Sequence, residues 1–318
     1  MKIIVIAPIL NEAWILPFVL KNFSSFADHI IVADQKSIDN TKEICATFPK
    51  VKVITNPYNG YTNEVRFMLL DEARLIPGEG NLIIQLDADE FIHPSFVQEV
   101  KILVQNNPTE KSVAFSSEWL QMYDTNRTYR TDGVWKNNYK AFAFIDHKDV
   151  DYNRNYITNE HISRIPDIQK IYKLNTPILH VQYLARKRCE LKQAVYMCTE
   201  RAQGINPRKT NNRYSIAKFR NGIPTKELAE IFYRDIELPQ TKDYASYDHT
   251  KLDTIMHLFD AHGSLFFEPL EIWHIDELRD RFIKENKRAP TKIKVFPKWL
   301  IILNNIRNKL KYKLIYRL

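Results

Sequence analysis

The chain has 318 residues, of which 44% are hydrophobic, so it is long enough to bury a substantial core. Its three cysteines, Cys45, Cys189 and Cys198, have no CxxC spacing, which argues against a disulfide framework or a thiolate zinc site and favours a reducing compartment. Ten Lys or Arg in residues 287–318 account for the net charge of +8, and subtracting them leaves the first 286 residues at −2, so nucleic acid is not an expected partner.

The first apolar run, IIVIA at residues 3–7, is interrupted by Pro8. A signal peptide would need a longer run and a small-residue cleavage site, so we expect a first strand in a cytoplasmic protein. Short β-branched runs at residues 29–34, 51–55 and 82–87 are further expected strands. No window approaches the roughly 20 apolar residues that a membrane-spanning helix needs.

Helical patterns separate these four runs, and each begins near a side-chain oxygen that can cap a helix. This alternation predicts an α/β fold, with a mostly parallel sheet flanked by helices. Ligands of such sheets bind at the carboxyl ends of the strands. Residues 8–12, 34–39 and 87–90 follow three such ends, so we expect them to meet in one cleft.

The pattern changes after Pro94, where a helix is expected to about Asn106, followed by an aromatic-rich, antiparallel section to about Val181. A long helix is expected from Arg186 to Gln203, and Gly204 suits its carboxyl cap.

Three domains are expected. Residues 1–204 would form the catalytic domain, residues 205–290 a helical extension, and residues 291–318 a basic amphipathic helix. The last helix would lie either on an anionic membrane surface or against the body of the protein, and its amphipathicity does not separate the two.

The predicted strand at residues 82–87 runs into three carboxylates, Asp87, Asp89 and Glu90, which repel one another at short range. Nucleotide-binding α/β domains usually hold phosphates with glycine-rich turns, but this chain has only seven glycines and none follows the first strand. Carboxylates that hold Mg²⁺ or Mn²⁺ against a diphosphate would serve the same purpose. Taken alone, a D-x-D sequence at a strand end is more often a capping turn.

Further motifs accompany this one in a fixed order. APILNEAWILPFVL contains the end of the first strand, and ADQKSIDNT follows the second with Asp34, Ser37, Asp39 and Thr41. DADE at residues 87–90 comes next.

Four later residues complete the series: Glu160 in NEHI, His180 in ILHVQYL, and Lys192 and Tyr196 on the next predicted helix. Over about 200 residues, this series resembles the family 2 glycosyltransferases of the GT-A fold. The resemblance is strongest to the bacterial branch that adds sugars to lipopolysaccharide core and related glycans.

The resemblance implies that Pro8, Glu12 and Asp34 surround the nucleoside of a nucleotide sugar, with Asp34 accepting a hydrogen bond from the base. It implies that Asp87 faces the ribose or a metal-bound water, and that Asp89 binds the divalent cation directly.

His180 would be the additional metal or diphosphate contact, and Glu160 the catalytic base. Each residue also has a structural interpretation, since Asp34 and Asp39 could cap the second helix, His180 could lie in the core, and Glu160 could be solvated.

The chain departs from the family pattern at Gln35 and Lys36, which replace an acid and a glycine. Arg66 is the nearest substitute for the family's arginine-asparagine pair, and it could contact base or phosphate or lie on an exposed helix face. Trp119 and Trp135 could stack on a sugar or belong to the core.

The predicted function is inverting transfer of a sugar, with a UDP-hexose as donor and a saccharide or lipid-linked acceptor at the inner face of the cytoplasmic membrane. Glu160 would deprotonate the acceptor, while the cation on Asp89 would stabilise the departing diphosphate. Two alternatives are a nucleotidyltransferase, which would normally carry a glycine-rich loop, and a non-catalytic, membrane-docked module.

Overall fold

The computed structural model describes residues 1–58, 62–107, 112–154, 164–215, 222–239 and 249–291. The described residues divide into two compact units, within Met1–Cys189 plus Phe219–Tyr247 and within Glu190–Lys218 plus Asp248–Leu318. The domain boundaries expected from sequence stay predictions. The basic helix expected over residues 291–318 lies outside the described residues, apart from Thr291.

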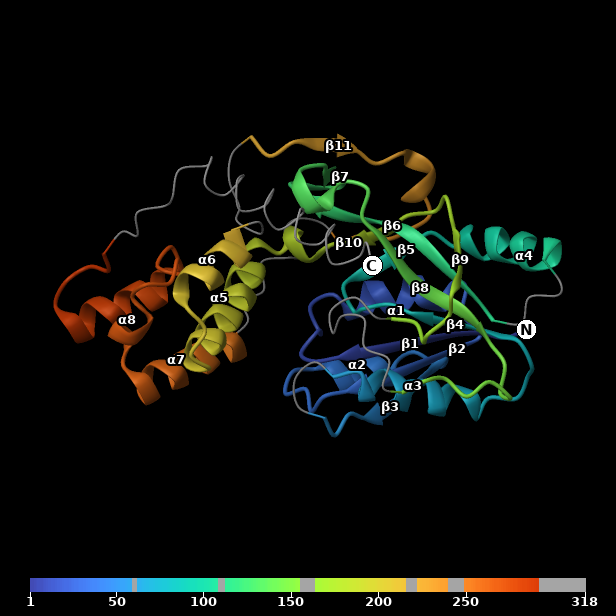
Figure 1. Ribbon diagram of the computed structural model, residues 1–318, viewed down its shortest axis with the longest axis horizontal. Helices are drawn as coiled ribbons and strands as arrows, with labels where there is room; N and C mark the ends of the chain where they lie inside the picture. The colour runs from blue at the N-terminus through green and yellow to red at the C-terminus, as the bar shows by residue number, and fades with distance from the viewer. Residues whose placement is uncertain (59–61, 108–111, 155–163, 216–221, 240–248, 292–318) are drawn as a thin grey trace, which may run out of the picture. The chain divides into compact units, whose positions relative to one another are not determined.

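A parallel sheet forms the centre of the first unit, with the strand order β3-β2-β1-β4 (Figure 1). Its strands are β1 (Ile3–Ile9), β2 (His29–Asp34), β3 (Val51–Thr55) and β4 (Asn81–Gln85). All three pairings among them are parallel. The predicted α/β fold is therefore confirmed, although β4 ends at Gln85, before the acidic residues.

Helices cover both faces of this sheet because alternate strand residues point to opposite sides. Val5 and Ala7 of β1 lie in one core with Leu20, whereas Ile4 and Leu69 lie in a second core. The helices of the first core are α1 (Leu16–Ser24), α2 (Thr41–Ala46) and α4 (Phe96–Asn106), and α3 (Glu64–Arg74) belongs to the second.

An antiparallel extension continues the sheet beyond β4. The order runs through β8 (Tyr139–Asp146), β6 (Val113–Tyr123), β7 (Thr125–Arg130) and β11 (Thr225–Glu227). The short β11 lies in a stretch predicted to be helical, so that prediction is wrong for these three residues, whose strand is defined by its pairing with β7.

Two short strands pair with β6 and correct the expectation of an antiparallel section. Strands β9 (Lys170–Lys173) and β10 (Ile178–His180) both run parallel to β6. Strand β5 (Glu90–Ile92) pairs antiparallel with β10, so Glu90 lies opposite His180. This arrangement brings the DADE motif to the end of β10.

The second unit is helical, as predicted for the carboxyl-terminal part of the chain. Its helices are α5 (Arg186–Ala202), which begins in the first unit, α6 (Pro207–Tyr214), α7 (His249–His262) and α8 (Asp276–Asn286). Gly204 has a φ of 82°, the left-handed value expected after a helix end. Within the described parts of the chain, no helix combines the length and apolarity required to cross a bilayer.

Candidate active site

Hydrogen bonds tie the loop after β1 to the loop after β2. The Ser37 hydroxyl accepts from the backbone N–H of Asn11 at 2.9 Å, and the Thr41 hydroxyl accepts from that of Glu12 at 3.1 Å. One Asp39 carboxylate oxygen accepts from the following backbone N–H of the first loop at 3.0 Å. The motif residues Ser37, Asp39 and Thr41 therefore shape the loop that carries Glu12.

The predicted nucleoside residues gather at the ends of β1 and β2. Pro8 pairs with the residue before Asp34, so the two lie on neighbouring strands. The buried Asp34 carboxylate accepts from the backbone N–H of Ser37 at 3.2 Å and lies 3.3 Å from the Lys42 ammonium. Glu12 accepts from the indole N–H of Trp14 at 2.6 Å. The structure thus brings Pro8 and Asp34 together, although the Asp34 carboxylate is also part of a local turn.

Two of the three carboxylates after β4 are paired with an arginine that no motif predicts. Arg164 donates from Nη2 to Asp87 Oδ2 at 2.6 Å and to Glu90 Oε1 at 2.7 Å, and its Nη1 donates to Glu90 Oε2. Arg164 is 2% exposed and Glu90 is completely buried. The positive partner of this pair of acids is therefore supplied by the chain itself.

Arg66 is a second cationic partner of Asp87. Its Nη2 lies 3.4 Å from Asp87 Oδ1, and its Nη1 donates to Gln85 Oε1 at 3.0 Å. Burial acts to raise the pKa of Asp87, but the charges of Arg164 and Arg66 outweigh it and hold that pKa below its usual value. Asp87 is therefore an ionised carboxylate bound to two guanidinium groups.

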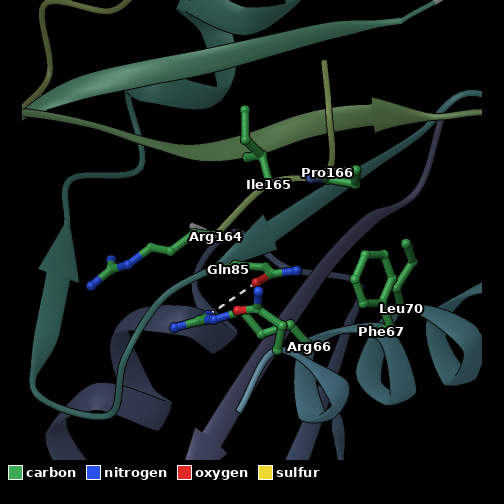
Figure 2. A pocket seen from close by; sticks show the side chains of 8 residues that line it. Arg66, Phe67, Leu70, Gln85, Arg164, Ile165 and Pro166 are labelled. Atoms are coloured by element: carbon green, nitrogen blue, oxygen red, sulfur yellow. Dashed lines mark hydrogen bonds between the residues drawn. The ribbon is translucent and has the colours of Figure 1, made fainter. Parts of the chain in front are cut away.

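Arg66 also lines a small pocket of about 20 Å³ (Figure 2). The pocket is lined by Asn63, Arg66, Phe67, Leu70, Gln85, Arg164, Ile165 and Pro166. Since the Arg66 side chain is only 15% exposed, the alternative of a solvated helix face does not hold.

Asp89 turns instead toward His180. Its Oδ2 lies 3.3 Å from His180 Nε2 and accepts from Gln182 Nε2 at 3.3 Å. Its backbone carbonyl accepts from the N–H of Val181 at 3.0 Å, which fixes the acidic loop to the end of β10. Of the three predicted metal residues, Asp89 and His180 thus lie together although they are far apart in sequence, while the third, Asp87, faces the arginines.

The Asp89–His180 pair fits a hard divalent cation. Neighbouring ligands of an octahedral Mg²⁺ lie about 3 Å apart, close to the separation of these two atoms. Among the residues that the structure describes, no group of three or more His, Cys, Asp or Glu side chains is arranged to hold a metal. Since Mg²⁺ sites commonly use one or two protein ligands plus water and substrate phosphates, two residues are enough.

Trp119 packs at the centre of the site and belongs to the core. Its indole N–H donates to Glu90 Oε1 at 2.5 Å, and its ring stacks on His180 with centroids 4.2 Å apart. The Lys140 ammonium lies 3.4 Å from the Trp119 ring centroid. The Trp135 ring stacks on the Trp119 ring with centroids 5.6 Å apart, and Trp135 is half-buried.

The pKa of Lys140 is lowered to about 8, first by burial and then by the charge of Arg164.

Glu160, the predicted base, lies outside the described residues, and its role stays a prediction. Arg164, four positions later, is placed against the acidic loop.

Residues 4–150 match the profile described as Glycosyl transferase family 2. A comparison with curated proteins finds no match.

Three solved structures illustrate the structural comparison. S. aureus TarS 1-349 aligns over 90% of this chain and 89% of its own length, with 12% identity and a TM-score of 0.39. TarS 1-349 with UDP-GlcNAc aligns over 38% of this chain and only 35% of its own length, with 19% identity and a TM-score of 0.32. Glucosyl-3-phosphoglycerate synthase from Mycobacterium tuberculosis with Mn²⁺, UDP and glucosyl-3-phosphoglycerate aligns over 38% of this chain and 44% of its own length. The identity is 22% and the TM-score is 0.28.

At these TM-scores the three likenesses add nothing to the assignment, which rests on the family match and the strand order. The match names a family and no branch of it. Residues 4–150 thus match Glycosyl transferase family 2, and they lie within a GT-A-like α/β fold that is followed by carboxyl-terminal helices.

Proposed function

We propose that this protein is an inverting glycosyltransferase that moves a sugar from a nucleotide diphosphate sugar to a saccharide or lipid-linked acceptor. The observation that carries the proposal is the Asp89–His180 pair, in which Asp89 follows the carboxyl end of β4 within the residues that match family 2, and His180 ends β10. Ligands of α/β sheets bind at this edge. Pro8, Glu12 and Asp34 are the proposed nucleoside contacts at the same edge, with Arg66 and Asp87 beside them.

The charges of the site agree with such a donor. Six interacting side chains form a charged cluster in the site. Its acids are Asp87, Asp89 and Glu90, and its bases are Arg66, Arg164 and Lys140. The cluster is therefore neutral before anything binds. A divalent cation adds two positive charges, which match the two negative charges of a nucleotide diphosphate sugar.

In the proposed reaction, the Glu160 carboxylate takes the proton of the acceptor hydroxyl as that oxygen attacks the anomeric carbon. The bond from that carbon to the diphosphate breaks on the opposite side, so the configuration inverts. Asp89 and His180 would hold Mn²⁺ or Mg²⁺, which when bound would stabilise the negative charge of the departing diphosphate. Arg164 keeps Asp87 and Glu90 in place.

A UDP-hexose is the proposed donor. The proposed acceptor is a cell-surface glycan or its glycolipid precursor, of the lipopolysaccharide-core type, at the inner face of the cytoplasmic membrane. The proposed membrane contact is the basic segment at residues 291–318.

A panel of nucleotide sugars, incubated with Mn²⁺ and assayed for release of the nucleoside diphosphate, tests the proposal. One donor should be hydrolysed well above the others, and NMR of the glycosylated product should show an anomeric configuration opposite to that of the donor. Pyrophosphate release from a nucleoside triphosphate and a sugar phosphate would instead identify a nucleotidyltransferase. Failure to turn over or bind any donor would identify a non-catalytic module.

A further inference from the structure

Gln121 is a buried residue of β6 that lies directly opposite His180 in the parallel pairing of β6 with β10. Its side-chain Nε2 donates to two backbone carbonyls, those of Met122 at 3.2 Å and His180 at 3.1 Å. Its Oε1 lies 2.6 Å from Nδ1 of the His180 ring. The amide therefore contacts both the backbone and the ring of the same histidine.

These contacts fix which way the amide points. Rotating it by half a turn would place Oε1 against two carbonyl oxygens, which cannot donate a hydrogen bond. Because Oε1 accepts only, the proton between the two side chains must belong to His180 Nδ1. In a neutral ring, Nε2 then carries a lone pair, and this is the nitrogen that faces Asp89 Oδ2 at 3.3 Å.

A lone pair that faces a carboxylate oxygen needs a positive group between the two, which is either a second ring proton, on Nε2, or a metal ion. In the other tautomer, Nε2–H would donate to Asp89 and the position would be filled by that proton. Stacking on Trp119, with centroids 4.2 Å apart, restricts rotation of the ring and so keeps Nε2 on the Asp89 side.

We propose that Gln121 is a positioning residue that holds His180 in the Nδ1–H tautomer and thereby sets the affinity of the Asp89–His180 pair for a divalent cation. The inference rests on the proposed cation site and adds a residue that no sequence motif identifies. Hydrogen bonds to the second ring nitrogen commonly fix the orientation of metal-binding histidines, and their loss typically weakens metal binding by about 10- to 100-fold.

Two substitutions separate positioning from a purely structural role. Gln121→Leu removes the acceptor for Nδ1–H and both donors to the backbone. Gln121→Glu also removes both donors but keeps an acceptor for Nδ1–H. Both variants should lose stability, whereas only Gln121→Leu should change the tautomer. Ser117→Ala is the matched control, because Ser117 is a buried residue of the same strand whose hydroxyl has no hydrogen-bond partner among the residues that the structure describes.

Two measurements are made on the full chain. Nitrogen-15 NMR of the histidine rings in metal-free protein reports the tautomer, with the His180 signal identified by its absence in His180→Ala. Electron paramagnetic resonance titration reports Mn²⁺ affinity without any need for turnover. Wild type, Ser117→Ala and Gln121→Glu should show Nδ1–H and similar affinities, while Gln121→Leu should lose that tautomer and bind about 10- to 100-fold more weakly.

A His180 ring in the wild type with a proton on Nε2 and none on Nδ1 would overturn the inference without any Gln121 variant. Equal Mn²⁺ affinity in Gln121→Leu and Ser117→Ala would also overturn it, as would parallel losses of affinity in the Leu and Glu variants. If the wild type and His180→Ala bind Mn²⁺ equally, the proposed cation site itself fails, and that result is distinguishable from the others.

Discussion

Arg164 and Glu90 form an ion pair that is almost completely removed from solvent, since the two residues are 2% and 0% exposed. The Glu90 carboxylate also accepts from the Trp119 indole and from the backbone N–H of Asp87 at 3.1 Å. These contacts join the acidic loop after β4 to strand β6 and to a segment far along the chain. The carboxylates after β4 therefore stabilise the fold and also form part of the candidate binding site.

Replacing Arg164 with Met should lower the free energy of unfolding by about 3–5 kcal/mol, because it leaves the Glu90 charge buried without its partner. Urea denaturation monitored by circular dichroism measures the loss. Arg154→Met is the matched control, since the Arg154–Asp71 pair has side chains that are 55% and 48% exposed and should contribute at most about 1 kcal/mol. Equal losses in the two variants would contradict a special role for the buried pair.

Asp89→Asn should abolish sugar transfer and Mn²⁺ binding while the protein remains folded. The amide keeps an oxygen for the Gln182 hydrogen bond but loses the negative charge that a hard cation needs. Turnover, paramagnetic resonance titration and circular dichroism measure the three quantities. Asp71→Asn, which changes an exposed carboxylate of α3, should leave all three unchanged. Undiminished turnover in Asp89→Asn would rule out the metal assignment.

Glu160→Gln should reduce turnover by roughly 10²- to 10⁴-fold, because the amide keeps the size of the side chain but cannot accept the acceptor's proton. Donor affinity should be almost unchanged, and steady-state kinetics with separate donor-binding measurements test both statements. A collapse of donor affinity would place Glu160 in the nucleotide site. Asp151 or Asp167 would then be the better candidate for the base.

Stability should depend on pH through Lys140, whose pKa is lowered from 10.5 to about 8 by burial and then by the charge of Arg164. Below that value both the folded and unfolded chains hold the proton, so the destabilisation from a buried ammonium is fully present. Between about pH 8 and about pH 10.4, the unfolded chain holds more protons than the folded one, so stability rises with pH.

The comparison of wild type with Lys140→Met isolates this contribution. The stability of the wild type relative to the variant should increase as pH rises through this window, as measured by urea denaturation at several pH values. Lys101→Met, at an exposed position of α4, should follow the wild type at every pH. Parallel curves for wild type and Lys140→Met would show that Lys140 has an ordinary pKa.

Deleting residues 297–318 should weaken binding to anionic vesicles and leave hydrolysis of the nucleotide sugar unchanged, because this segment carries much of the chain's basic excess. Co-sedimentation with vesicles that contain phosphatidylglycerol measures the effect. Equal binding by the truncated protein would favour a helix that packs on the body of the protein.

Local patterns in the sequence determine the parallel half of the fold. The runs at 29–34 and 51–55 coincide with β2 and β3, and α4 ends at Asn106 as predicted. A strand of alternating or continuous apolar residues can be recognised from the sequence, because the spacing of its apolar residues shows which of its faces are buried. Strand β11 has no such signal, since its three residues are all exposed, and it exists only through its pairing with β7.

The ordered motifs similarly predict that Asp34 lies beside Pro8, and that Asp89 lies near His180. Only the tertiary structure decides which of the chain's 46 Lys and Arg residues meets which acid. Arg164 contacts Asp87 and Glu90 although 77 and 74 residues of chain separate it from them, and attraction between charges depends on distance in space. Sequence spacing sets no such distance, so the arginine in the site could not be predicted from the sequence.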